Sequence, residues 1–388
     1  MREDVTGIGK VDHRNDRRHF GVRREDRFLH VYVIGKTGTG KSTLLGQMAA
    51  QDLAAGNGFA LIDPHGDLVD RLHADAIRSG GRDVLYLNAT DPNQPYGYNP
   101  LRHVRGDRIP LAASGLLEVF KKMWSDAWGV RMEHILRNAL YALLEQKEAT
   151  LSDILRLFRD RTYRKSIAAS LENDAVRLFW EKEFERYTFS YRTDGIASIQ
   201  NKIGAFLADP VMRRILTEPG EPISLRKVMD EGKVLLVNLG KGRIGEDSSA
   251  LLGGLLVTTI GLAAYSRADT APEARRDFFV YVDEFQSFTT LAVADMLSEL
   301  RKYRVGLTMA HQYLFQLEPE IRHAVLGNAG TLISFRLGAE DASYISREFN
   351  ERFAVGDLLN LPNHHIYLKL MIDGQPSQPF SAITRAGG

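Results

Sequence analysis

Short apolar runs alternate with polar loops toward both ends of the chain, and each run is followed by glycine or by acidic and polar residues. Such runs, bounded by turn residues, are typical of strands that are buried on both faces of a sheet. Helix-like segments separate them, which predicts right-handed βαβ units and a parallel sheet covered by helices. The predicted strands are residues 31–34, 59–62, 84–87, 233–239, 277–282, 305–310, 330–335 and 366–372.

The pattern changes between residues 105 and 219, where strand-like runs stop and apolar residues recur at helical spacing. We interpret this region as an all-α domain inserted into an α/β domain. The polar, charge-rich start of the chain predicts a mobile segment. The expected organisation is a flexible lead-in at 1–26, a nucleotide-binding domain at 27–106 and 220–388, and the all-α insertion at 107–219.

The longest apolar stretch, residues 251–265, contains three glycines and is shorter than a comfortable bilayer span. We interpret it as a buried helix. No signal peptide is visible in the charged first thirty residues. We expect a cytoplasmic protein, which could lie at the inner face of the cell membrane through a partner or through an anchor that the sequence lacks.

The sequence G-x-x-x-x-G-K-S follows the first predicted strand and precedes a helical segment. In this context the pattern indicates a P-loop, whose glycines bring backbone N–H groups close to a polyphosphate at a helix N-terminus. The amine of Lys41 is expected to reach the β- and γ-phosphates, and the hydroxyl of Ser42 to bind Mg²⁺. The predicted nucleotide-binding residues are Gly35, Thr37, Gly38, Thr39, Gly40, Lys41, Ser42 and Thr43.

Polar side chains also follow later strands. Asp283 and Glu284 come directly after an apolar strand downstream of the P-loop, so we expect Asp283 to orient Mg²⁺ and Glu284 to polarise the attacking water. Gln312 ends another strand and is expected to sense the γ-phosphate or position water. Asp63 has two interpretations: it could contribute to the surroundings of Mg²⁺, or it could cap the next turn.

Composition narrows the possibilities in two ways. The formal net charge of +1 means that contact with nucleic acid requires local patches or a positive pore. The absence of cysteine excludes disulfides, thiolate catalysis and zinc–thiolate sites. A basic cluster lies between Arg156 and Lys165, and we favour a solvated helix face over a DNA-facing surface.

Several short blocks occur in one order and together resemble the HerA–FtsK superfamily of hexameric DNA-pumping ATPases. The helical insertion is similar to the all-α domain of conjugative type IV secretion coupling proteins. These proteins usually carry N-terminal transmembrane helices, which this sequence lacks. The blocks are the P-loop, 62–67, 98–101, 282–285, 310–312 and the segment 328–337.

The resemblance implies a RecA-like P-loop NTPase core that binds ATP and Mg²⁺. It also implies a homo-oligomer, expected to be a hexamer when active, with DNA in the bore of a ring. Relaxase or secretion-system proteins could bind through the all-α domain. An arginine from the neighbouring subunit would complete each site; Arg336 is the first choice, with Arg304, Arg301 and Arg243 as alternatives.

The leading hypothesis is therefore an ATP-hydrolysing DNA translocase whose catalytic residues are Lys41, Glu284, Gln312 and Arg336. Two alternatives remain. One is a nucleotide-gated docking platform for relaxase or effector proteins, and the other is a soluble HerA-like translocase in DNA repair or defence. A regulatory GTPase is disfavoured because the base-reading N-K-x-D pattern is absent.

Overall fold

The structure is a computed structural model that describes residues 4–13, 16–78, 84–102, 104–217 and 220–384. The chain forms two compact units. Unit 1 contains residues 1–88, 225–242 and 263–388, and unit 2 contains residues 89–224 and 243–262. The predicted domain boundary at residue 219 lies outside the described residues.

Unit 1 is built on one large sheet. Its parallel part has the order β11-β3-β10-β9-β4-β8-β5, so consecutive strands of the chain are separated by crossovers. The carboxyl ends of these strands consequently lie along one edge of the sheet, which we call the carboxyl edge; the opposite edge is the amino edge. The strands are β3 (Val31–Ile34), β4 (Gly58–Asp63), β5 (Val84–Asn88), β8 (Val234–Asn238), β9 (Phe278–Val282), β10 (Val305–His311) and β11 (Thr331–Ser334).

Antiparallel strands extend the sheet beyond β11. They follow the order β12 (His365–Lys369), β15 (Phe380–Thr384), β1 (Val5–Val11) and β2 (His19–Arg23). The prediction of a flexible lead-in is therefore wrong for β1. Ile8 and Val22 are fully buried. Strand β1 pairs with β15 at the far end of the chain, a partner that a local pattern cannot reveal.

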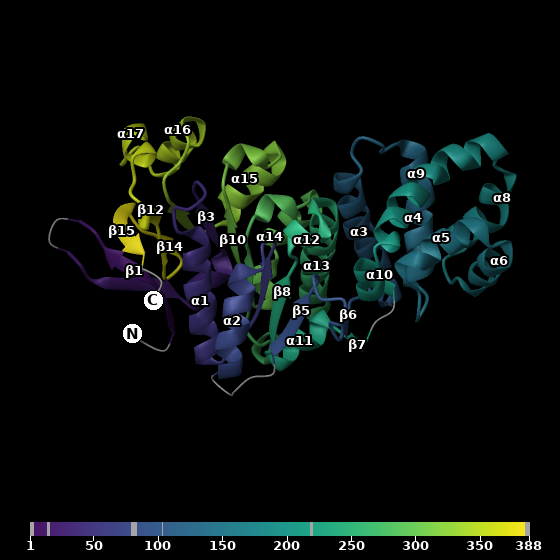
Figure 1. Cartoon of the computed structure of the whole chain (residues 1–388), viewed down its shortest axis with the longest axis horizontal. Coiled ribbons are helices and arrows are strands. Elements are labelled where there is room, and N and C mark those ends of the chain that lie inside the picture. The colour runs from purple at the N-terminus through teal and green to yellow at the C-terminus, as the bar shows by residue number, and fades with distance from the viewer. Residues whose placement is uncertain (1–3, 14–15, 79–83, 103, 218–219, 385–388) are drawn as a thin grey trace. The chain divides into compact units, whose positions relative to one another are not determined.

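Helices cover the sheet of unit 1 (Figure 1). Leu44, Leu45 and Met48 of α1 pack in one apolar core with Phe59 and Leu61 of β4. Between β9 and β10, the helical segment is divided into α14 and the 3₁₀ turn η7. Helical elements of unit 1 include η1 (Glu25–Leu29), α1 (Lys41–Ala55), α2 (Asp67–Arg78), α11 (Leu225–Glu231), α14 (Leu291–Leu297), η7 (Leu300–Tyr303), α15 (Pro319–Asn328), α16 (Ala339–Glu348) and α17 (Val355–Leu359).

Unit 2 is almost entirely helical. Most of α13 (Glu246–Ser266) belongs to it, although the sequence pattern places this segment in the resumed α/β core. Packing explains the difference, because the hydroxyl of Tyr98 donates to the carbonyl of Leu255 at 2.9 Å. The other helices are α3 (Ile109–Met123), α4 (Val130–Leu144), α5 (Leu151–Arg159), α6 (Arg161–Ser170), α7 (Asp174–Leu178), α8 (Phe184–Arg186), α9 (Phe189–Ala208) and α10 (Pro210–Thr217).

One helical segment in the described part of the chain, Glu246–Asp269, is long and apolar enough to cross a membrane. Of its most apolar window, 67% is buried inside the protein. Core helices of folded domains have this same character, which agrees with the buried helix predicted there.

Candidate active site

The P-loop lies where β3 ends and α1 begins. Gly38 and Gly40 have φ values of +73° and +121°, a region that favours glycine. The loop is connected to both neighbouring strands, because the N–H of Gly35 donates to the carbonyl of His311 and the N–H of Lys36 to that of Arg336. These contacts prearrange the loop at a helix N-terminus, which is suited to binding phosphate.

Lys41 is buried in this loop. Its amine donates to the carbonyls of Gly35, at 2.6 Å, and Lys36, at 3.1 Å. Burial lowers the pKa of Lys41, and the nearby carboxylates of Asp283 and Glu284 act in the opposite direction. The ammonium is thus hydrogen-bonded to backbone carbonyls, and phosphate oxygens can replace these carbonyls as its acceptors.

Asp283 follows β9 directly, and the hydroxyl of Ser42 donates to its Oδ2 at 2.6 Å. Burial raises the pKa of Asp283, and the carboxylates of Glu284 and Asp63 add to the effect. A hydroxyl and a carboxylate at this distance fit Mg²⁺, which binds proteins through one or two carboxylates and completes its shell with phosphates and water. Among the described residues no cluster of three or more His, Asp or Glu side chains offers an all-protein metal site.

Glu284 has a left-handed backbone, with φ +49° and ψ +47°. For glutamate this conformation costs on the order of 1 kcal/mol, and such strain concentrates at functional sites. Both of its carboxylate oxygens accept from side-chain amides: Oε1 from Gln312 at 2.5 Å and Oε2 from Gln286 at 2.6 Å. The carbonyl oxygen of Gln312 in turn accepts from the hydroxyl of Thr37 at 2.7 Å. One chain of hydrogen bonds therefore joins the P-loop, β10 and β9.

Asp63 caps the start of α2. Its Oδ1 accepts from the N–H of His65 at 2.8 Å, and its Oδ2 from the N–H of Leu68 at 2.9 Å. Of the two interpretations of Asp63, the structure favours capping, because both carboxylate oxygens are engaged by backbone. The pKa of Asp283 nonetheless responds to this carboxylate, so Asp63 adds negative charge near the expected metal position.

The four candidate arginines lie in different places. Arg336 is on the carboxyl edge beside its own P-loop, and its guanidinium donates to Leu361 O and Asn363 Oδ1. Arg304 lies at the amino edge, in ion pairs with Glu25 and Asp277. The remaining two are exposed: Arg301 in η7 of unit 1 and Arg243 in unit 2.

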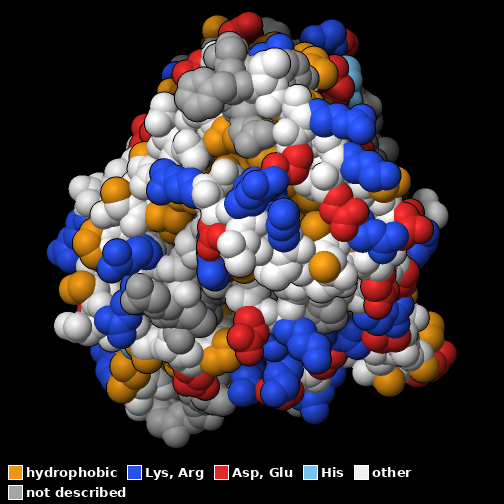
Figure 2. Space-filling view, turned by 90° about the vertical axis from the view of Figure 1, so that its right-hand side faces the viewer, with side chains coloured by type: hydrophobic (Ala, Val, Ile, Leu, Met, Phe, Trp, Pro, Cys, Tyr) orange, Lys and Arg blue, Asp and Glu red, His pale blue; other side chains and the backbone are white. Residues whose placement is uncertain are grey.

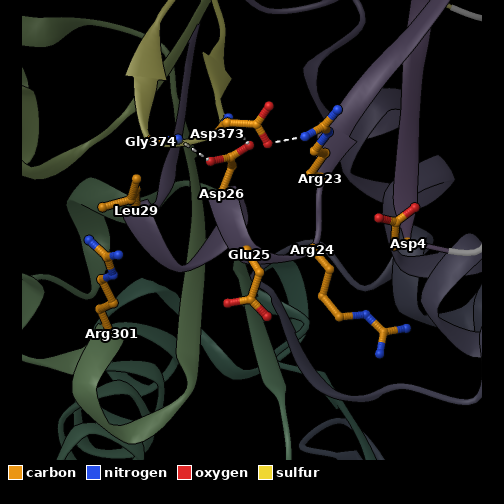
Figure 3. Close-up of a pocket in the computed structure, with 9 residues that line it drawn as sticks. All are labelled: Asp4, Arg23, Arg24, Glu25, Asp26, Leu29, Arg301, Asp373 and Gly374. Carbon is orange, nitrogen blue, oxygen red and sulfur yellow. Dashed lines mark hydrogen bonds and ion pairs between the residues drawn. The ribbon is translucent and has the colours of Figure 1, made fainter.

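Arg301 lines a cavity of about 650 Å³ at the amino edge, together with Glu25, Asp26 and Arg24 (Figure 3). No hydrogen bond or ion pair is found for its side chain within the ranges that the structure covers. Asp26 accepts from the N–H groups of Asp373 and Gly374 and so shapes one side of this cavity.

Sequence reasoning missed three residues that contact the site. Gln286 lies two positions after Glu284, and its spacing from a predicted catalytic acid was the available signal. Phe335 and His364 lie against the P-loop glycines: a Cβ on Gly35 would come 2.5 Å from Phe335 Cβ, and one on Gly40 would come 2.8 Å from His364 Nδ1. His364 is over 300 positions from the P-loop, and no local pattern indicates it.

Comparison with known proteins shows the family to which this chain belongs. The profile described as "Type IV secretion-system coupling protein DNA-binding domain" matches residues 20–350, most of the chain. This chain belongs to that family. Its similarity to the HerA–FtsK superfamily and its α/β P-loop core, both predicted from sequence, are thereby confirmed. None of the curated proteins matches the chain.

Several solved structures share the fold. A bacterial conjugative coupling protein, TrwBdeltaN70 in unbound form, is 16% identical with a TM-score of 0.66, over 97% of this chain and 88% of that one. TrwB in complex with ADP and Mg²⁺ is 17% identical with a TM-score of 0.67, over 95% and 87% of the two chains. VirB4 of Thermoanaerobacter pseudethanolicus is 14% identical with a TM-score of 0.64, over 98% and 97%.

Proposed function

We propose that this coupling-protein family member is an ATPase that uses ATP and Mg²⁺ to move DNA through a homo-oligomeric ring, a hexamer when active, during type IV secretion. The observation that carries the proposal is the hydrogen-bonded chain from Thr37 through Gln312 to Glu284, beside the Ser42–Asp283 pair. It links the phosphate-binding loop to two adjacent strands. The family description, with its DNA-binding domain, and the ADP–Mg²⁺ complex of TrwB support the same conclusion.

The residues of the carboxyl edge divide the work of hydrolysis. The N–H groups of 38–43 and the amine of Lys41 bind the phosphates, while Ser42 and Asp283 hold the metal or its water shell. Mg²⁺, when bound, supplies positive charge to the β- and γ-phosphate oxygens. Glu284 polarises the attacking water, which requires its carboxylate to release at least one of the two amides that now donate to it. Gln312, which contacts both Thr37 and Glu284, reports the presence of the γ-phosphate.

A neighbouring subunit would supply the remaining positive charge, and the placement of Arg301 favours it over Arg336 for this role. β10 has seven residues, which separates the two sheet edges by about 20 Å. Arg301 precedes β10 and therefore lies far from the P-loop of its own chain, as expected of a residue that acts in a neighbour's site. Arg336 contacts its own P-loop through its backbone, and Arg304 is already ion-paired.

Charge pairing in unit 2 bears on what that unit binds. In the predicted basic cluster, Arg164 is buried and pairs with Glu185 at 2.7 Å, Arg161 approaches the same carboxylate, and Arg156 approaches Asp160. Figure 2 shows Lys and Arg side chains mixed with Asp and Glu on this side of the molecule. Mixed charge suits a protein partner better than a polyanion. Relaxase or secretion-system proteins would bind here, at the cytoplasmic face of the membrane, while DNA contacts the ring bore.

The test is ATP turnover with and without single- and double-stranded DNA over a range of salt concentrations. We expect DNA to stimulate turnover and the stimulation to fall steeply with salt, because phosphate contacts release counterions. Lys41→Ala should abolish turnover and leave the circular dichroism spectrum and thermal midpoint unchanged. If neither single- nor double-stranded DNA changed the rate of ATP turnover at low salt, translocation would be refuted and the ATPase assignment would remain.

A further inference from the structure

The groups expected to surround the terminal phosphate all lie on one side of the P-loop. Asp283 and Glu284 follow β9, and Gln312 follows β10. In the sheet order, both strands are on the same side of β3, and β11 is on the other side. The triphosphate chain has the γ-phosphate at one end and the nucleoside at the other, so fixing the γ-phosphate and metal toward β10 directs the nucleoside toward β11.

A short loop after α17 occupies that side of the P-loop. The N–H of His364 donates to the carbonyl of Thr39 at 2.8 Å. Arg336, which follows β11, donates from Nη1 to Leu361 O at 3.1 Å and from Nη2 to Asn363 Oδ1 at 3.0 Å. The carbonyl of Arg336 accepts from the N–H of Lys36 at 2.9 Å. Both the loop and Arg336 are thus hydrogen-bonded to the backbone of the P-loop. Asn363, in the same loop, is exposed.

His364 has an unusual conformation and an unusual neighbour. Its φ of +67° is rare for a residue with a Cβ, and its carbonyl accepts from the N–H of Thr384 at 2.9 Å, which holds it there. Its ring lies against Gly40, where a Cβ would come 2.8 Å from Nδ1. This nitrogen is buried and has no hydrogen-bond partner among the described residues. An unpaired buried ring nitrogen is costly and is often explained by a ligand or a water.

We propose that Arg336, Asn363 and His364 form the seat for the ribose and base of the bound nucleoside triphosphate. This inference rests on the nucleotide-binding part of the proposed function. The amide of Asn363 and the ring of His364 hydrogen-bond the ribose hydroxyls, and the planar guanidinium of Arg336, fixed by two acceptors, offers a flat face to the base. Arg336 is then a binding residue of its own subunit's site, distinct from the arginine given by a neighbour.

The experiment compares a triphosphate ligand that carries a nucleoside with one that does not. Affinity for a non-hydrolysable ATP analogue and for inorganic tripolyphosphate, each with Mg²⁺, is measured by calorimetry on Asn363→Ala and His364→Gly. Glycine accepts the positive φ at 364. We expect each change to lower the affinity for the ATP analogue by about 10-fold, which corresponds to the loss of one or two hydrogen bonds. The affinity for tripolyphosphate should stay within twofold of that of the unsubstituted protein. Asn360→Ala is the matched control, because within the described residues that amide donates to Gly356 O, at 2.8 Å, and not to the P-loop or to Arg336.

Two results would overturn the inference. Equal weakening of both ligands would mean that the loop only supports the P-loop, and unchanged affinity for both would place the nucleoside elsewhere. DNA is absent from the experiment, so a failure of translocation does not affect its outcome. If the unsubstituted protein binds neither ligand, the nucleotide-binding proposal itself fails.

Discussion

The two edges of the main sheet in unit 1 are both rich in charged and polar side chains. The hydrogen-bond partners of these side chains differ between the two edges. At the carboxyl edge, Glu284 is held by flexible amides, and Lys41 by loop carbonyls that a phosphate can replace. At the amino edge, Arg27 and Asp52 are buried and joined by two hydrogen bonds of 2.8 and 2.7 Å. Polar groups that can exchange hydrogen-bond partners can take part in catalysis, whereas groups enclosed in a buried network stabilise the fold.

Arg27 makes the most contacts described for this network, although its Nε is buried without a hydrogen-bond partner among the described residues. It also donates to the hydroxyls of Thr6 in β1 and Tyr281 in β9, and its guanidinium carbon lies 3.4 Å from the ring centroid of Phe279. One side chain thereby connects the N-terminal hairpin, the P-loop helix through Asp52, and the strand that precedes Asp283. Arg301, also at this edge, is exposed, and within the described residues its side chain has no hydrogen bond or ion pair, although its charge helps to lower the pKa of Glu25.

The largest effect on ATP turnover is expected for a substitution of Arg301. Arg301→Ala should lower ATP turnover by about 10³-fold if the guanidinium completes a neighbour's site. Mixing Arg301→Ala with Lys41→Ala subunits should restore part of the turnover, because some interfaces then combine an intact P-loop with an intact arginine. The measurement is steady-state ATP turnover of each variant and of the mixture.

A matched control is Arg336→Ala, which should not complement Lys41→Ala, since both residues contact the same subunit's P-loop. Recovery with Arg336→Ala and none with Arg301→Ala would reverse the assignment of the two arginines.

The next effect concerns the stability of the enclosed network. Arg27→Met leaves the carboxylate of Asp52 buried without its cation, which should lower the free energy of unfolding by about 3–5 kcal/mol. The double variant Arg27→Met/Asp52→Leu should regain much of this loss because no charge remains buried. Urea denaturation followed by circular dichroism measures both. A single variant as stable as the unsubstituted protein would show that the network contributes nothing.

The smallest effect is a pH dependence at the same edge. His30 Nδ1 accepts from the N–H of Leu307 at 3.1 Å, so Nε2 carries the proton that is donated to Leu297 O at 2.7 Å. Burial lowers the pKa of His30 from 6.5 to about 4. Between these values the unfolded chain binds more protons, so this contribution to stability is lost as pH falls through that window, by about 2 kcal/mol between pH 7.5 and 5.

Glycine adopts the φ of +64° and ψ of +154° found at His30 more readily than any other residue, so His30→Gly is the comparison. Urea denaturation at the two pH values should give the variant a smaller pH dependence than the unsubstituted protein. Equal pH dependence in the two proteins would mean that this imidazole does not titrate on unfolding.

The sequence alone determined the chemistry that is carried by neighbours along the chain. The P-loop, the Asp283–Glu284 pair and the parallel strands were predictable because each depends on a local pattern: glycines at fixed spacing, acids at a strand end, or a short apolar run between helices. Tertiary structure decided what depends on distant partners. It paired β1 with a strand that ends at residue 384, placed most of α13 in unit 2, and brought His364 to Gly40. It also separated Arg301 from Arg336 by the length of a strand, because which edge a residue occupies follows from strand direction and order in the folded sheet.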